Sequence, residues 1–304
     1  MGIQKFQDRI AEKCLSHLTM PEVQVWPTLA KREDHRRSQS VQSLIDETLL
    51  TPYSVRESSK LDINRYTDIR AYDRTAVPGV NANVVADSHG RWWVAAQAPL
   101  PSNFYTFFHN ILHSTASAHP LINKPPSHSA VIVQLTGWEE NGMRKADPYL
   151  PDPHGRLTFT HNRDSIILHH VNTTWLPSAG TSLSELKLED MVLYHYHFKG
   201  WSDHGVPKNT SELRQLVMDV HAKQQEANCE VWVHCSAGVG RTGTFIALSS
   251  LLTSRREVGP QRSADKLPPA IASDPVARTV DELREWRTML VQTPGQLGLI
   301  YKMM

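Results

Sequence analysis

The sequence predicts a mixed α/β fold in a single domain, and three observations lead to this prediction. Short apolar runs separated by clusters of Pro, Gly, Ser and Asn occupy residues 60–200, as expected for the strands of a sheet. From residue 209 the apolar residues recur with a helical period. A strand-like run at 230–234 then leads directly into an apolar helical stretch at 242–252. The 304 residues allow two domains without requiring them, and one mixed α/β domain is the simplest interpretation of the pattern.

The N-terminal part of the chain, residues 1–50, has a helical and charged pattern. Its densest charge cluster, KREDHRR at 31–37, carries both signs and is interpreted as the solvated face of a helix. A docking role for this cluster is kept as the alternative.

Four runs in the middle of the chain predict strands because they are rich in β-branched and aromatic residues. They are WWVAAQAPL (92–100), SAVIVQLTG (129–137), SIILHHV (165–171) and MVLYHYHF (191–198). The histidines of the last two runs are interpreted as alternating positions on sheet faces and not as metal ligands.

Helical periodicity marks the C-terminal part. Leu213, Leu216, Val217 and Val220 follow the i, i+3, i+4, i+7 pattern of a helix. Asn209 at the start of that helix and Glu212 three residues later resemble a capping box. Residues 253–278 are polar and Pro-rich and are interpreted as a long surface loop, followed by a last helical stretch at 279–290.

Composition excludes several classes of protein. The formal net charge of +1 gives no basic field that would favour nucleic acid. No apolar run is long enough to cross a bilayer, and the N-terminus lacks the pattern of a signal peptide. Three cysteines are too few for a disulfide framework and suit a reducing compartment. We therefore expect a monomeric cytoplasmic protein, with the nucleus as an alternative location.

The stretch VHCSAGVGRTG, residues 233–243, holds the strongest functional signal. Its GVGRTG part matches the glycine pattern of a dinucleotide-binding turn. That interpretation fails because residues 253–278 supply no second strand with an acidic residue about 20 positions on. The loop also lacks the Lys-Ser/Thr ending of a nucleotide phosphate loop.

A phosphate-binding nest explains the same stretch better. Backbone N–H groups at the start of a helix would point at an oxyanion, and Arg241 would add a planar, two-pronged donor. The residues of this Cys-to-Arg phosphate-binding loop are Ser236, Ala237, Gly238, Val239, Gly240 and Arg241. Cys235 at its base would be held as a thiolate and become a nucleophile, whereas the alternative is a buried, inert cysteine.

The loop resembles the H-C-x-x-G-x-x-R-[S/T] signature of the protein tyrosine phosphatases, in particular the phosphotyrosine-specific, non-receptor members. Further segments resemble that family in the expected order, among them INRYTDI (63–69), WSDHGVP (201–207) and VQTPGQLGLIY (291–301). The resemblance implies a highly twisted mixed sheet flanked by helices. It also implies that residues 1–304 form one phosphatase domain, with a helical extension at 1–40 and a catalytic core at 41–304.

The resemblance also implies a mechanism that uses no cofactor and no metal. Cys235 would form a cysteinyl-phosphate while Arg241 and the loop amides hold the phosphate oxygens. Asp203 would act as general acid and then as general base, and Thr242 would donate to the sulfur as it leaves. The substrates would be phosphotyrosine-containing proteins.

Other matched residues would support this chemistry. Gln292 and Gln296 would place the hydrolytic water, the alternative being two surface amides. Tyr66 would line a pocket deep enough for a phosphotyrosine ring, and Asp68 would accept hydrogen bonds from the substrate backbone. His234 would hold the loop by hydrogen bonding.

The hairpin and the acid loop complete the match. Glu140 would pair with Arg241 and Lys145 with Asp203, although both could instead be ordinary surface charges. The family's usual Pro after the acid-loop Trp201 is replaced by Ser202, which removes a stiff residue from that loop. The alternatives to a tyrosine phosphatase are a phosphotyrosine-binding pseudophosphatase and a dual-specificity or phosphoinositide phosphatase.

Overall fold

The computed structural model describes residues 20–59, 62–201, 205–253 and 267–304. The helices are α2 (Met20–Ile45), α3 (Arg56–Ser59), α4 (Phe104–Leu112), α5 (Thr210–Ala227), α6 (Gly240–Thr253), α7 (Pro275–Arg284) and α8 (Pro294–Met303). Short 3-10 turns lie at η2 (Asp73–Thr75), η3 (Pro101–Asn103) and η4 (Pro177–Ala179). The strands are β1 (Ala82–Ala86), β2 (Trp92–Ala96), β3 (Ser129–Gln134), β4 (Glu139–Glu140), β5 (Met143–Arg144), β6 (Arg156–His161), β7 (Asp164–Leu176), β8 (Thr181–Leu188), β9 (Met191–Phe198) and β10 (Glu230–His234).

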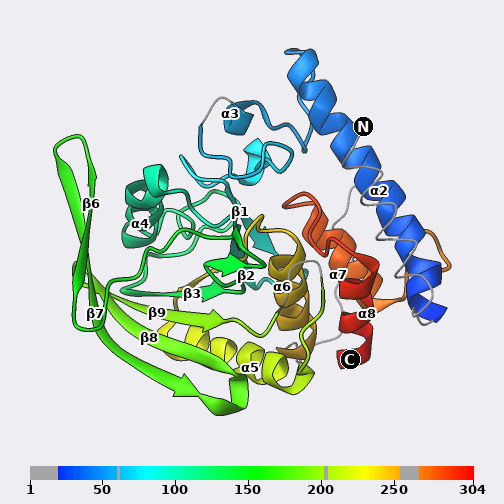
Figure 1. The fold of residues 1–304 in the computed structure, drawn as a ribbon. Coiled ribbons are helices and arrows are strands. Elements are labelled where there is room, and N and C mark those ends of the chain that lie inside the picture. The colour runs from blue at the N-terminus through cyan, green and yellow to red at the C-terminus, as the bar shows by residue number, and fades with distance from the viewer. Residues whose placement is uncertain (1–19, 60–61, 202–204, 254–266) are drawn as a thin grey trace.

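A mixed eight-stranded sheet forms the centre of the fold, in the order β1-β2-β10-β3-β9-β8-β7-β6 (Figure 1). Strand β10 is parallel to both of its neighbours, β2 and β3, and β3 is parallel to β9. The remaining pairs in this sheet are antiparallel, and β4 and β5 form a separate small hairpin. This is the predicted mixed α/β fold with a twisted sheet and flanking helices.

Strand β10 is buried along its whole length because the sheet is covered on both faces. Successive side chains of a strand point to opposite faces, so Val231 and Val233 enter one core and Trp232 enters the other. The first core includes side chains of α5, α6, α7 and α8, and the second includes Phe107 and Phe108 of α4. The end of β10 is thus a rigid, central support for the residues that follow it.

Most of the elements expected from the sequence are present. The four strand-like runs become β2, β3, β7 and β9, and the run at 230–234 becomes β10 followed by α6. Asn209 caps α5, because its side chain accepts hydrogen bonds from the backbone N–H groups of Ser211 and Glu212. Strands β6 and β8 were not anticipated from the sequence pattern. Both lie toward the β6 end of the sheet, where several side chains are exposed and the apolar runs are short.

Of residues 253–278 the structure describes 253 and 267–278, and the interpretation as a surface loop is wrong for several of these, since Thr253 ends α6. Leu267 and Ile271 are buried in the first core. Helix α7 begins at Pro275, where the side chain of Asp274 caps it by accepting from the N–H of Ala277. Asp at the N-cap with Pro at the first helical position is a helix start signal that the Pro-rich composition obscured.

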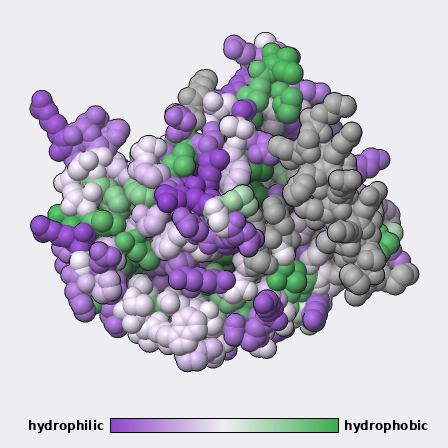
Figure 2. All heavy atoms as spheres, in the orientation of Figure 1, coloured by the Kyte–Doolittle hydropathy of each residue, from purple (hydrophilic) through white to green (hydrophobic). Residues whose placement is uncertain are grey.

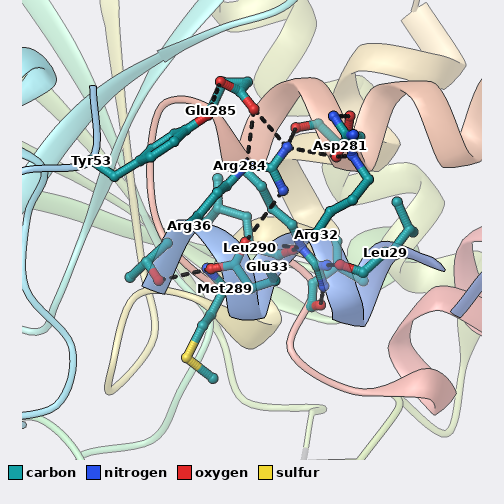
Figure 3. Close-up of polar contacts among 12 residues, drawn as sticks. Leu29, Arg32, Glu33, Arg36, Tyr53, Asp281, Arg284, Glu285, Met289 and Leu290 are labelled. Atoms are coloured by element: carbon teal, nitrogen blue, oxygen red, sulfur yellow. Dashed lines mark hydrogen bonds and ion pairs between the residues drawn. The ribbon is translucent and has the colours of Figure 1, made fainter. Parts of the chain in front are cut away.

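The interpretation of the cluster at 31–37 as a solvated face is also wrong for several of its members. Arg36 is buried and donates to the carboxylates of Asp281 and Glu285 on or just after α7, while Arg32 binds Asp281 through two hydrogen bonds of 2.9 Å (Figure 3). These partners lie about 250 positions further along the chain, so local charge patterning could not reveal them. Helix α2 therefore packs against α7 and α8 (Figure 1).

The face shown in Figure 2 is mostly polar, with an apolar patch at the C-terminal end of α2. Val41, Leu44, Ile45 and Leu50 are exposed there. Among the described residues, no helix combines the length and apolar character that crossing a bilayer requires.

Candidate active site

The loop after β10 is shaped by close backbone contacts. Gly238 has a φ of 72°, and a Cβ at this position would fall on the carbonyl oxygen of Ala96 in the neighbouring strand β2. Only glycine satisfies both the left-handed conformation and the contact. The central strand and helix α6 therefore hold the whole stretch from Cys235 to Arg241 in one conformation.

Cys235 lies at the base of this loop and is 4% exposed. Burial by itself raises the pKa of its thiol, but the charge of Arg241, the hydroxyl and N–H of Thr242 and the N–H of Gly238 outweigh burial. The pKa is therefore lowered below its ordinary value. The N–H of Gly238 donates to the sulfur at 3.3 Å. This environment favours the thiolate, which is the nucleophilic form.

Arg241 is the fixed positive charge of the loop. Its guanidinium donates to Glu140 Oε1 at 2.6 Å and to the carbonyl oxygen of Trp201 at 2.9 Å. Glu140 in turn accepts hydrogen bonds from the hydroxyl of Thr136 and the N–H of Gly137. These contacts hold the hairpin carboxylate in the position where it pairs with Arg241. The structure thus brings Glu140 and Arg241 together, and such a charge-assisted contact orients the guanidinium plane.

Tyr66 approaches the loop from a distant part of the chain. The hydroxyl of Ser236 donates to the carbonyl oxygen of Lys145 at 2.7 Å, so the Tyr66 hydroxyl is the donor in its 2.8 Å contact with Ser236 Oγ. The ring of Tyr66 packs on an apolar cluster that includes Val239 and Met289. Asp68, two residues after Tyr66 in the same segment, is exposed.

Gln292 and Gln296 lie beside the end of the loop, at Gly240. A Cβ on Gly240 would be 3.0 Å from Gln292 Oε1 and 2.9 Å from Gln296 Nε2, so both amides reach the start of α6. Gln296 is buried and its Oε1 accepts from the N–H groups of Gln292 and Thr293. A capping box between Thr293 and Gln296 explains why this glutamine is held so firmly.

His234 holds the loop from behind the cysteine. Burial lowers the pKa of His234 to about 4, so its ring is neutral near pH 7. Nδ1 donates to the carbonyl oxygen of Cys235 at 2.9 Å, and Nε2 accepts from the Tyr149 hydroxyl at 2.6 Å. Tyr149 was not singled out from the sequence, because nothing local distinguishes it from any other buried tyrosine.

Arg287 is a second residue that sequence reasoning missed. It is fully buried and donates to the carbonyl oxygens of Gly238 and Ala237. The Ala237 carbonyl lies in the same peptide plane as the Gly238 N–H, so this contact helps to orient the N–H that donates to the Cys235 sulfur. Asn81 and Asn83 accept its other hydrogen bonds. Asn81 and Asn83 alternate with apolar residues in the stretch VNANVV. Because buried polar side chains need hydrogen-bond partners, this pattern could have indicated a buried partner such as Arg287.

Two of the candidate residues, Ser202 and Asp203, lie outside the described residues. Their neighbour Trp201 is buried, and its Nε1 donates to the carbonyl oxygen of Gly205 at 2.8 Å. Lys145 is also buried, so the alternative of an ordinary surface charge does not fit it. The hydrogen bond from Trp201 to Gly205 therefore joins the two described residues that flank 202–204.

The buried histidines make the fold sensitive to acid. Burial lowers the pKa of His197, like that of His234, from 6.5 to about 4. The unfolded chain binds these protons at higher pH, so stability is complete above about pH 6.5 and falls as the pH decreases toward 4. We expect a loss of about 3 kcal/mol for each histidine, measured as the free energy of unfolding in urea.

The substitution His197→Gln serves as the matched control, because glutamine keeps a donor for the carbonyl oxygen of Thr136 and does not titrate. It should reduce the slope between pH 6.5 and 4. Equal stability of the unmodified chain at pH 7 and pH 4.5 would contradict the assignment of neutral, buried rings.

Comparison with known proteins agrees with this geometry. The model of the family described as protein-tyrosine phosphatase matches residues 60–304. Tyrosine-protein phosphatase non-receptor type 4 of Homo sapiens is 28% identical over 248 residues, covering 78% of this chain and 24% of the relative. Protein-tyrosine-phosphatase PTP1 of Arabidopsis thaliana is 27% identical over 279 residues, covering 84% and 73%.

Tyrosine-protein phosphatase 99A of Drosophila melanogaster is 31% identical over 209 residues, which are 62% of this chain but 15% of the relative. The chain thus spans about a quarter or less of the first relatives it matches. The crystal structure of a Trypanosoma brucei protein tyrosine phosphatase superposes with a TM-score of 0.67 at 24% identity, covering 94% of this chain and 95% of that one, and supports the fold. Because the family model covers the signature loop and every strand of the sheet, this chain belongs to the protein-tyrosine phosphatase family.

Proposed function

We propose that this chain hydrolyses phosphotyrosine in proteins through a cysteinyl-phosphate intermediate. The observation that carries the proposal is a buried cysteine with a lowered pKa in a loop whose arginine is fixed by Glu140. A thiolate at the base of an anion-binding nest is suited to attack phosphorus.

In the first step the Cys235 sulfur forms a bond to phosphorus and the bond from phosphorus to the phenolic oxygen breaks. Asp203, assigned here through the WSDHGVP match, gives its proton to the leaving oxygen. Arg241 and the backbone N–H groups of residues 236–241 carry the charge of the equatorial oxygens. No external oxidant, metal or cofactor enters this step.

In the second step water attacks phosphorus and the sulfur–phosphorus bond breaks. Asp203 takes a proton from the water, and Thr242 stabilises the departing thiolate, in keeping with its effect on the pKa of Cys235. Gln292 and Gln296 position the water, which the approach of both amides to Gly240 supports. The products are inorganic phosphate and the free enzyme.

Tyr66 and Asp68 select the substrate. The contact of the Tyr66 hydroxyl with Ser236 and the packing of its ring near Val239 support an aromatic wall that the phosphate passes before it reaches Cys235. A phosphotyrosine side chain spans this depth, whereas phosphoserine and phosphothreonine are too short. Asp68 is exposed at the rim and accepts hydrogen bonds from the backbone of the substrate peptide.

We also propose that residues 1–304 act as one monomeric domain in the cytoplasm. The contacts of α2 with α7 and α8 support a single unit, since the helical extension shares the first core. The sparse cysteines support a reducing compartment.

Paired peptides test the substrate class. We expect kcat/KM to be much larger for a phosphotyrosine peptide than for the same peptide with phosphothreonine, because only the longer side chain seats its phosphate fully. Tyr66→Ala should raise KM for the phosphotyrosine peptide by about ten-fold, or about 1–2 kcal/mol of lost stacking and burial. Steady-state kinetics by phosphate release give both values.

Tyr105→Ala is the control. It removes an aromatic ring of α4 that stacks on His161 of β6, and it should leave the preference for phosphotyrosine intact. Comparable kcat/KM on the two peptides would instead indicate a shallow, dual-specificity pocket.

A further inference from the structure

Helix α2 reaches the loop of Gln292 through one buried carboxylate. Glu33 is 5% exposed, and its Oε1 accepts hydrogen bonds from the Thr288 hydroxyl at 2.9 Å and from the Met289 N–H at 2.7 Å (Figure 3). This helix precedes residues 60–304, the part matched by the family model. Glu33 is one of the members of the charge cluster at 31–37 that the structure shows to be buried.

The segment that Glu33 holds has an unusual backbone. Met289 has a φ of 56° and Val291 a φ of 63°, both in the left-handed region. A β-branched residue such as valine is a genuine outlier there. Strained backbone of this kind persists only where its surroundings determine it, and it gathers at functional sites.

Hydrogen bonds from outside the segment reach the backbone of each of its three residues. Glu33 accepts from the Met289 N–H, and buried Arg284 donates to the carbonyl oxygens of Leu290 and Val291 at 2.9 and 2.7 Å. Arg284 also donates to the carbonyl oxygen of Leu29 in α2 at 2.8 Å, which ties the same segment to the helix a second time (Figure 3). Both anchors therefore join α2 to residues 289–291.

The held segment leads directly to the site. The N–H of Val291 donates to the carbonyl oxygen of Val239 in the signature loop at 3.1 Å, and Gln292 follows at once. The Gln292 side chain then extends to the start of α6 beside Gly240. Displacement of the Met289 peptide would thus move the amide that is assigned to the hydrolytic water.

We propose that Glu33 is a positioning residue for the second chemical step, in which it holds the 289–291 segment so that Gln292 places the attacking water. This inference rests on the proposed phosphatase function. Glu33 acts on hydrolysis of the cysteinyl-phosphate, whereas formation of this intermediate depends on Cys235, Arg241 and the acid loop.

Stopped-flow kinetics of the full chain with p-nitrophenyl phosphate test the inference. Glu33→Ala removes the acceptor for the Met289 N–H, and a small misplacement of Gln292 should lower kcat by roughly 10- to 100-fold. Because the second step alone is slowed, KM should fall together with kcat and kcat/KM should stay near the wild-type value. The burst of p-nitrophenolate should rise toward one equivalent per active site.

A merely structural effect gives a different pattern. Partly unfolded protein would lower kcat and the burst in proportion while KM stays constant. Glu33→Gln keeps an oxygen acceptor in the same place and should recover most of the lost rate. Tyr53→Phe is the matched control in the same ion network, because it removes a hydrogen bond to Glu285 Oε2 and leaves Met289 untouched; its burst should equal that of the wild type.

If Glu33→Ala does not fold, Glu33→Asp provides the test, since the shorter side chain withdraws the carboxylate from Met289 and should give the same kinetic pattern to a smaller degree. Equal losses of kcat and kcat/KM, or an unchanged burst, would overturn the role of Glu33 while the phosphatase function stands. A wild-type chain with no turnover would contradict the proposed function, and this inference with it.

Discussion

Cys235→Ser should abolish turnover, with a loss of roughly 10⁵-fold or more in kcat, because serine cannot be ionised by the surroundings that lower the pKa of the thiol. The nest and Arg241 remain in place, so binding of a phosphate ester should be largely preserved. Hydrolysis of a phosphotyrosine peptide measures the first expectation, and isothermal titration with the same peptide measures the second.

Cys229→Ser is the matched control for this substitution. Burial raises the pKa of Cys229 to about 11, so this thiol is protonated near neutral pH and is not a nucleophile. Cys229 directly precedes β10, whereas Cys235 directly follows it. Replacement of Cys229 should therefore leave turnover close to the wild-type rate. Residual turnover of Cys235→Ser above a few per cent, free of contaminating wild type, would contradict the assignment of the nucleophile.

Arg241→Lys should lower kcat by roughly 10³-fold or more, although the charge is kept, because an arginine on the transferring phosphoryl group is worth that much. Lysine presents a point charge without the planar fork, so it cannot bind two phosphate oxygens while it pairs with Glu140. The hydrogen bond to the Trp201 carbonyl would also be lost, and with it the link from the signature loop to Trp201. Kinetics on a phosphotyrosine peptide measure the effect.

Arg156→Lys, an exposed position on β6, is the control for the conservative exchange and should have no effect on kcat. If Arg241→Lys retains more than a tenth of the wild-type kcat, bidentate phosphate binding is not what this side chain supplies.

The signature loop could be predicted from the sequence because its chemistry is local. Cys235 and Arg241 are six positions apart, and the strand before them and the helix after them have clear patterns. The same holds for α5, whose cap and apolar face lie within one stretch. These elements could be predicted because the residues that determine their conformation are neighbours in the chain.

The supports of the loop could not be predicted because their partners are far apart in the sequence. Arg287 meets Asn83 across 204 positions, and Glu33 meets Met289 across 256. Each of these residues has an ordinary polar character in its own stretch, and only the fold gives it a buried partner. The mistaken solvated face at 31–37 has the same cause. Arg36 pairs with Asp281, and Glu33 accepts hydrogen bonds from Thr288 and Met289. No pattern of local charges encodes these distant partners, which replace water around both side chains.

The central claim is that Cys235 carries the phosphoryl group during hydrolysis of phosphotyrosine. Rapid acid quench of the enzyme with a phosphotyrosine peptide, followed by mass spectrometry of the digested chain, tests this claim most directly. We predict a phosphate on Cys235 that forms within the first turnover and is absent from Cys235→Ser. Turnover of the peptide with no phosphate on Cys235 at any time, in an enzyme whose second step is slow enough to trap the intermediate, would contradict it.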